Sequence, residues 1–173
     1  MDTQSQEITE KSVLDNLNTI QSYGANNSSL IYLDSRNGDV LAYVGSANYN
    51  DEEIDGMVDM VQQPRQPWSS IKPLVYSLWF MSLPLTLDTP IFDLRFKVGN
   101  DTPNNNDGSF MGLLPLKKAL GYSRNIPAIK MYFSVGGQEK LVPFFNSIGI
   151  DSYKENADYG YPMAIGSAEL KMI

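Results

Sequence analysis

The chain has 173 residues, of which 42% are apolar, and a formal net charge of −7. This length and apolar fraction suit one domain, or a large part of one, and the acidic balance argues against nucleic acid as a partner. Histidine and cysteine are absent, which excludes a Ser-His-Asp triad, a thiol nucleophile and disulfides. We expect no cofactor and no metal site, because only carboxylates would remain as metal ligands.

The beginning of the sequence predicts a helix followed by a β-hairpin. Apolar residues fall at mostly helical spacing from Ile8 to about Tyr23, within a leading segment of about residues 1–25. Two short apolar runs then flank Asn37-Gly38, the strongest short-range hairpin signal that a sequence carries, so we expect a hairpin over residues 28–46. Neither run alternates cleanly, which favours strands covered on both faces.

Residues 69–173 are expected to be mainly helical. The stretch Leu83–Gly112 is rich in proline, glycine and asparagine and is interpreted as irregular. Strand signals occur only in the hairpin, and a two-stranded sheet is marginal, so we expect further strands beyond Ile173. Helical patterns cover four segments: Ser69–Phe80, Pro115–Tyr122, Pro127–Val135 and Gln138–Ser147.

Ser69 and Lys72 are the first candidate catalytic residues. Three apart on a helix, they share one face, where a neutral lysine amine can take the serine proton and produce a nucleophile. The helix N-terminus and partial burial both disfavour a charged lysine at this position. The spacing alone is weak, because about one such pair is expected by chance in a chain of this composition.

Ser123 and Asn125 supply a second hydroxyl and an amide between two predicted helices. A connecting loop at this point can face the same pocket as Ser69 and Lys72. The alternative is that Ser123 and Asn125 cap a helix, since both residue types favour helix ends. Arg124, between them, is expected to face solvent or to pair with an acidic residue.

Several motifs occur in a fixed order along nearly all of the chain, from about Ile8 onward. They are Gly45-Ser46-x-x-Tyr49, Arg65-Gln66-Pro67-x-Ser69-Ser70-Ile71-Lys72-Pro73, Asp88-Thr89-Pro90, Pro103-x-Asn105, Ala119-Leu120-x-x-Ser123-Arg124-Asn125-Ile126-Pro127-Ala128 and Ile165-Gly166-x-x-Glu169. Together with the Ser-x-x-Lys and Ser-x-Asn patterns, this series resembles the transpeptidase domain of the class A (bifunctional) penicillin-binding proteins.

The resemblance implies a fold and a role for each candidate residue. The fold would be α+β, the penicillin-binding and β-lactamase-like transpeptidase fold, with a sheet flanked by helices and incomplete at its C-terminus. Residues 1–173 would then form one partial transpeptidase domain. Ser69 would be the acylated nucleophile, with its backbone N–H in the oxyanion hole, and Lys72 the general base. Ser123 would relay a proton to the leaving amine, and Asn125 would bind the peptide backbone of the donor.

The resemblance also implies the partners and the compartment. The substrates would be peptidoglycan stem peptides ending in D-Ala-D-Ala, with β-lactams as their analogues, at the extracytoplasmic face of the membrane. A glycosyltransferase domain and a membrane anchor would precede the chain in the full-length protein. Two alternatives stay open: a β-lactamase or D,D-carboxypeptidase, which passes the acyl group to water, and a non-catalytic penicillin-recognising or scaffold remnant.

Two departures from the family pattern matter. The chain contains no Lys-Thr-Gly tripeptide, which in the family binds the substrate carboxylate and supplies the other oxyanion donor. Losing one such donor typically costs about 10²–10³ in rate, so we expect this chain to be inactive alone. The family has glycine where this chain has Trp68. One hypothesis is a UGA codon that means glycine but is read as tryptophan, and Trp79 would be equally suspect. The two codons test it.

Overall fold

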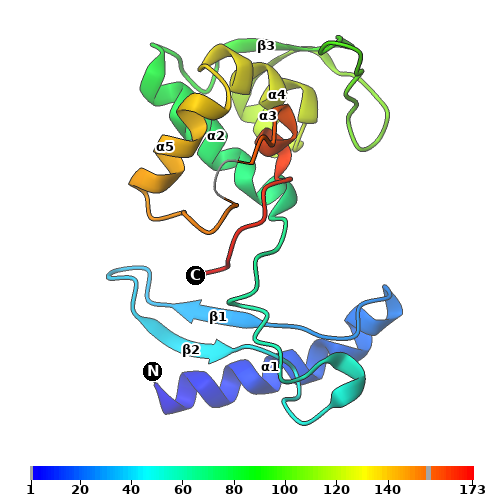
Figure 1. The fold of residues 1–173 in the computed structure, drawn as a ribbon, viewed down its shortest axis with the longest axis vertical. Helices are drawn as coiled ribbons and strands as arrows, with labels where there is room; N and C mark the ends of the chain where they lie inside the picture. The colour runs from blue at the N-terminus through cyan, green and yellow to red at the C-terminus, as the bar shows by residue number, and fades with distance from the viewer. Residues whose placement is uncertain (1, 155–156) are drawn as a thin grey trace. The chain divides into compact units, whose positions relative to one another are not determined.

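The computed structural model describes residues 2–154 and 157–173 (Figure 1). The chain divides into two compact units, one formed by the segment up to Pro64 with Lys171–Ile173, and one formed by Arg65–Leu170. In the described residues each unit combines helices with a two-stranded antiparallel sheet, as the expected α+β class requires. Among these residues there is no helix long and apolar enough to cross a membrane.

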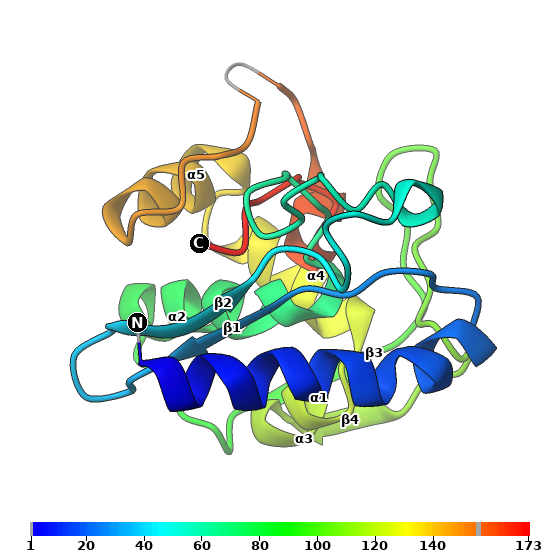
Figure 2. The same ribbon diagram turned by 90° about the horizontal axis from the view of Figure 1, so that it is seen from below.

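The first unit is a helix packed along a hairpin. Helix α1 (Thr3–Ser22) runs beside strands β1 (Leu30–Leu33) and β2 (Val40–Val44) (Figure 2). The Gln6 side chain joins the helix to β2, because its Oε1 accepts the Tyr43 N–H at 2.9 Å and its Nε2 donates to the Tyr43 carbonyl at 3.0 Å. A side chain here takes the place of a further strand along part of β2. A short 3-10 turn, η1 (Glu52–Ile54), follows.

The hairpin forms where the Asn37-Gly38 signal placed it, with Leu30 opposite Val44. The expectation that both faces of the strands are covered is wrong for β1, where Tyr32 and Leu33 are both exposed. Tyr32 and Leu33 follow one another and point to opposite faces, and both are exposed because α1 packs mainly on β2 and leaves the end of β1 uncovered. The Ala42 and Val44 side chains of β2 are buried.

The second unit is mainly helical, as expected. Its core contains α2 and α4, which pack together, and the buried side chains of Val75, Tyr76, Met131 and Phe145. The helical elements are η2 (Trp68–Ile71), α2 (Lys72–Ser82), α3 (Leu116–Gly121), α4 (Asn125–Ser134), α5 (Gln138–Ser147) and η3 (Tyr161–Ile165).

The second unit also contains a hairpin that the sequence did not predict. Strand β3 (Pro90–Asp93) pairs with β4 (Gly112–Pro115), so the interpretation of residues 83–112 as irregular is wrong at both ends of this pairing. Ile91 and Asp93 are buried while Phe92 is exposed, the alternation of a strand with one covered face. Helices α3 and α4 pack on this hairpin, which places the end of β3 close to the start of α4.

Candidate active site

Ser69 lies in the 3-10 turn η2, directly before the first turn of α2. Pro73 occupies that first turn, where a missing N–H costs no hydrogen bond. Ser69 is half-buried, and its carbonyl accepts the backbone N–H of Lys72. The polypeptide that leads into this turn is anchored by an antiparallel bridge, in which Arg65 and Leu170 exchange two backbone hydrogen bonds of 2.8 Å.

The Lys72 side chain brings two distant segments together. It is 1% exposed, and its Nζ donates to the Ser123 carbonyl at 2.6 Å, to the Asn125 Oδ1 at 2.7 Å and to the Ser123 Oγ at 3.1 Å. Three of the four candidate residues are therefore in direct contact. Within residues 2–154 and 157–173, the Ser69 hydroxyl makes no hydrogen bond with Lys72, and the two residues are linked through their backbones.

The pKa of Lys72 is lowered from 10.5 to about 8, first by burial and second by the positive charge of Arg124. The neutral amine is the form that accepts a proton. With a pKa of about 8, roughly a tenth of the amine is neutral at pH 7, about 300-fold more than at a pKa of 10.5. The surroundings of Lys72 thus increase the share of its amine that can accept a proton.

Ser123 is exposed and lies in the tight connection between α3 and α4 with a positive φ of 53°. Such a value is uncommon for a residue other than glycine and is often found at functional sites. The capping alternative holds for Ser123 through its backbone. The Ser123 N–H donates to the Leu120 carbonyl and the Arg124 N–H to the Ala119 carbonyl, both at 2.9 Å, which are the hydrogen bonds of a Schellman cap that ends α3. Asn125 does not cap α4 with its side chain. The Asn125 N–H donates instead to the Oδ1 of Asn105 at 2.8 Å, and no side chain at the N-cap, Arg124, caps α4.

Arg124 pairs with acidic residues, one of the two possibilities that its position left open. It is 6% exposed, its Nε donates to Asp93 at 2.8 Å, and its Nη1 donates to Asp107 at 2.9 Å. The pKa of Asp107 is lowered strongly by hydrogen bonds from Ser109 and from Arg124. The arginine between the two candidate residues is therefore a buried anchor for the loop that carries them.

The residue before Ser69 has a backbone conformation that favours glycine. Trp68 has a φ of 49°, and its indole is 67% exposed. Its N–H donates to the Gly166 carbonyl at 3.3 Å, and a Cβ added to Gly166 would lie 2.1 Å from the Trp68 oxygen. The buried indole N–H of Trp79 has no partner in the described part of the chain. Trp68 thus has an unfavourable backbone conformation, and Trp79 has a buried N–H without a partner in the described residues. The hypothesis of misread glycine codons stays a prediction.

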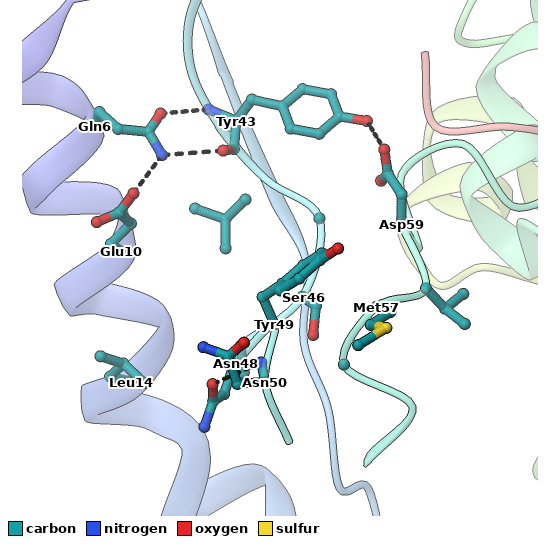
Figure 3. A pocket seen from close by; sticks show the side chains of 15 residues that line it. Gln6, Glu10, Leu14, Tyr43, Ser46, Asn48, Tyr49, Asn50, Met57 and Asp59 are labelled. Atoms are coloured by element: carbon teal, nitrogen blue, oxygen red, sulfur yellow. Dashed lines mark hydrogen bonds between the residues drawn. The ribbon is translucent and has the colours of Figure 1, made fainter. Parts of the chain in front are cut away.

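A separate pocket of about 510 Å³ lies in the first unit (Figure 3). Its lining includes Gln6 and Glu10 of α1, and it extends to Tyr49 and Asp59 beyond β2. Tyr43 spans one side of it, with its hydroxyl donating to Asp59 at 2.6 Å. None of the four candidate residues lines this pocket.

Comparisons with known proteins support the family that the sequence motifs indicated. Residues 29–167 match the family described as the penicillin binding protein transpeptidase domain. Penicillin-binding protein 1C of Escherichia coli strain K12 is 29% identical over 145 residues, which cover 83% of this chain and 19% of that protein. The crystal structure of penicillin-binding protein 1A from Haemophilus influenzae has a TM-score of 0.69 at 29% identity, and the match covers 84% of this chain and 21% of that one.

A second solved structure has the same fold at a lower sequence identity. The penicillin-binding protein PonA1 of Mycobacterium tuberculosis matches 98% of this chain and 45% of its own, with a TM-score of 0.76 at 20% identity. The expected transpeptidase fold is confirmed. The chain belongs to the penicillin-binding protein transpeptidase family, within the class A group that the motifs indicated. It spans about a fifth of the length of the Escherichia coli relative.

Proposed function

We propose that this chain carries the acylation centre of a serine D,D-transpeptidase that crosslinks peptidoglycan stem peptides. The observation that supports this most directly is Lys72, a buried amine in contact with Ser123 and Asn125 at the start of the helix that follows Ser69. The family match supports the reaction class.

In the first half-reaction, the Ser69 Oγ attacks the carbonyl carbon of the penultimate D-alanine. The hydroxyl proton passes to the neutral Lys72 amine, and the bond to the last D-alanine breaks. The departing amine takes a proton through the Ser123 hydroxyl, so D-alanine leaves and an ester on Ser69 remains. In the second half-reaction, an amine of another stem peptide attacks the ester carbonyl and forms the crosslinking amide. The bond to Ser69 breaks, and the proton that the amine gives up returns to the Ser69 oxygen through Lys72.

Two further groups would act on the donor peptide. The backbone N–H of Ser69 would stabilise the oxyanion, a contribution typically of about 10²–10³ in rate for each donor. Asn125 would hold the peptide backbone of the donor. Its amide already donates to the Asn104 carbonyl at 3.0 Å, so a substrate carbonyl would have to share or replace a contact of this amide.

The substrate class determines the partners and the place of action. A β-lactam presents a strained amide to the same nucleophile, so penicillins would acylate Ser69. Peptidoglycan lies outside the cytoplasmic membrane, which places the reaction at the extracytoplasmic face. In the full-length protein we expect a glycosyltransferase domain and a membrane anchor upstream, as well as a Lys-Thr-Gly strand to complete the site.

Labelling with a fluorescent penicillin tests this function in the full-length protein. We expect one covalent adduct, located by mass spectrometry on Ser69 and lost in Ser69→Ala. Ser70→Ala is the matched control, because Ser70 is the exposed neighbour whose hydroxyl donates to the Pro67 carbonyl. This control should label as the unmodified protein does.

The same experiment separates the alternatives. An adduct that persists, together with crosslinked product from stem peptides, supports the transpeptidase. Rapid release of the acyl group to water indicates a β-lactamase or a D,D-carboxypeptidase. A folded full-length protein that takes no label would be a non-catalytic remnant, and the proposed function would be wrong.

A further inference from the structure

A buried polar cluster joins the end of β3 to the start of α4. Asp93 is 0% exposed and Asn105 is 5% exposed. A buried carboxylate costs several kcal/mol unless it is paired and hydrogen-bonded. Asp93 is fully satisfied, because it accepts from Arg124 Nε at 2.8 Å, from the Met111 N–H at 3.0 Å and from Asn105 Nδ2 at 2.8 Å.

Asp93 fixes which way the Asn105 amide faces. The Asn105 Nδ2 donates to Asp93 and to the Ser109 carbonyl at 2.9 Å, so the Oδ1 must point to the other side. That oxygen accepts the N–H groups of Asn125 at 2.8 Å and Ile126 at 3.3 Å. Asn105 therefore caps α4 from a different segment of the chain.

The neighbours of Asn105 hold the Asn125 side chain in the same way. Its Nδ2 donates to the Asn104 carbonyl at 3.0 Å and to the Asn106 Oδ1 at 3.3 Å. This leaves the Asn125 Oδ1 as the acceptor for Lys72 Nζ at 2.7 Å. Segment 104–106 thus fixes both the backbone and the side chain of Asn125, and a continuous series of hydrogen bonds runs from Asp93 to Lys72.

We propose that Asn105, oriented by Asp93, is a positioning residue for acylation: it fixes Asn125 so that the Lys72 amine stays beside Ser123. This rests on the proposed function. Neither Asp93 nor Asn105 contacts the Lys72 amine, so both act through Asn125. Arg124 pairs with one Asp93 oxygen at 2.8 Å, and the other oxygen accepts the Asn105 Nδ2 that orients the amide.

The chemistry of the pair suggests a reciprocal exchange. Asn105→Asp removes the donor to Asp93 and places two carboxylates in contact, whereas Asp93→Asn removes the charge that Arg124 pairs with. The double variant D93N/N105D keeps one amide and one carboxylate. The new amide at position 93 can donate to the new carboxylate at position 105, whose other oxygen still accepts the N–H groups of α4. The double variant still loses the bond to the Ser109 carbonyl, which then faces a carboxylate oxygen, and Arg124 keeps a hydrogen bond to position 93 without the ion pair.

The test measures acylation of the full-length protein by a fluorescent penicillin over time and at several concentrations. This gives the acylation rate constant at saturation, the half-saturating concentration and the fraction of protein labelled. A 1 Å misplacement of catalytic groups can lower a reaction rate about 10²-fold. We therefore expect each single variant to lower the acylation rate constant about tenfold or more. The half-saturating concentration should change little, and D93N/N105D should be faster than either single variant while remaining slower than the unmodified protein.

A merely structural role gives a different result: the labelled fraction falls, while the rate constant of the labelled protein is unchanged. That outcome overturns the proposal, as does a double variant slower than both single variants. Asn27→Ala is the matched control in the first unit, where the Asn27 Oδ1 accepts the Ala47 N–H at 2.9 Å. It should lower stability and leave the rate constant unchanged.

Two provisions keep the test decisive. If the single variants do not fold, Asn105→Ser replaces them, because one shorter hydroxyl cannot reach both Asp93 and the Asn125 N–H, and an unchanged rate constant then overturns the proposal. Absence of label on the unmodified protein, or label on Ser69→Ala, overturns the proposed function instead.

Discussion

Two segments of the second unit carry the candidate site, and they are held in different ways. The turn at Trp68 and Ser69 and the loop at Ser123 each contain a residue other than glycine with a positive φ, 49° at Trp68 and 53° at Ser123. The turn is held by close backbone packing on Gly166, whereas buried hydrogen bonds hold the loop: Arg124 Nε donates to Asp93, and Asn105 Oδ1 accepts the Asn125 N–H.

Strained backbone can therefore be maintained either by packing or by polar contacts, and a different kind of substitution weakens each. Such a conformation persists only where the surroundings determine it more than once. A packed turn fails when volume is added, and a hydrogen-bonded loop fails when one partner is removed. The predictions below separate these two modes.

The largest effect is expected for Gly166→Ala, which attacks the packed turn. A methyl group here would lie 2.1 Å from the Trp68 oxygen, and Gly166 has a φ of 90°. Overpacking costs about 1–3 kcal/mol, and the left-handed conformation adds about 1–2 kcal/mol. Penicillin labelling of Ser69 should be lost. Gly99→Ala is the matched control, because Gly99 also has a positive φ but has open space around its Cβ position. In thermal unfolding this variant should lose only the stability that the left-handed conformation costs.

Arg124→Met removes a hydrogen-bond donor that holds the loop and should lower the free energy of unfolding by about 3 kcal/mol. This is at the lower end for a broken buried ion pair, because Asp93 keeps its donors from Asn105 and Met111. Denaturant unfolding measures the loss. Lys117→Met breaks an exposed pair with Asp88 and should change stability by about 1 kcal/mol or less. Equal losses in the two variants would contradict the anchoring role of Arg124.

The acylation rate should depend on pH through Lys72. Below its pKa of about 8 the lysine carries a proton and cannot accept another, so the rate should fall about tenfold for each pH unit below that value and level off above it. Stopped-flow labelling over a pH series measures this. Because the charge of Arg124 contributes to the lowered pKa, Arg124→Met should move the midpoint to higher pH. A pH-independent rate would exclude Lys72 as the base.

The smallest effect is expected for Trp68→Gly, which relieves the turn. A residue with a side chain in this conformation costs about 1–2 kcal/mol relative to glycine, so the variant should be more stable by about 1 kcal/mol. Trp68→Ala is the matched control, since it removes the indole and keeps the backbone strain. A gain of the same size in both variants would assign the strain to the indole instead.

The sequence predicted the elements that local pattern determines. The helices followed from apolar spacing, and the first hairpin followed from Asn37-Gly38. The second hairpin was missed because residues 94–111 separate its strands, so no short-range signal marks the pairing. Asp93 added to the difficulty: a charged residue at an inward position of a strand breaks the apolar alternation that would have indicated β3.

The candidate site was predicted in part. The motifs identified Ser69, Lys72, Ser123 and Asn125, and the structure brings the last three together. Asn105 was noticed as part of Pro103-x-Asn105 but received no role, because an asparagine among asparagines is typical of a loop. Its contacts with Asp93 and Asn125 join residues 12 and 20 positions away in the chain, and such contacts require the fold to be known.

The three contacts of the Lys72 amine depend on its protonation state. As an ammonium ion, Lys72 has three N–H groups for its three acceptors. As a neutral amine it has two N–H groups and one lone pair, and the Ser123 carbonyl and the Asn125 Oδ1 can only accept. Of these three partners, the Ser123 hydroxyl alone can reverse its hydrogen bond and donate to the nitrogen. The orientation of this hydroxyl therefore reports whether Lys72 holds its proton.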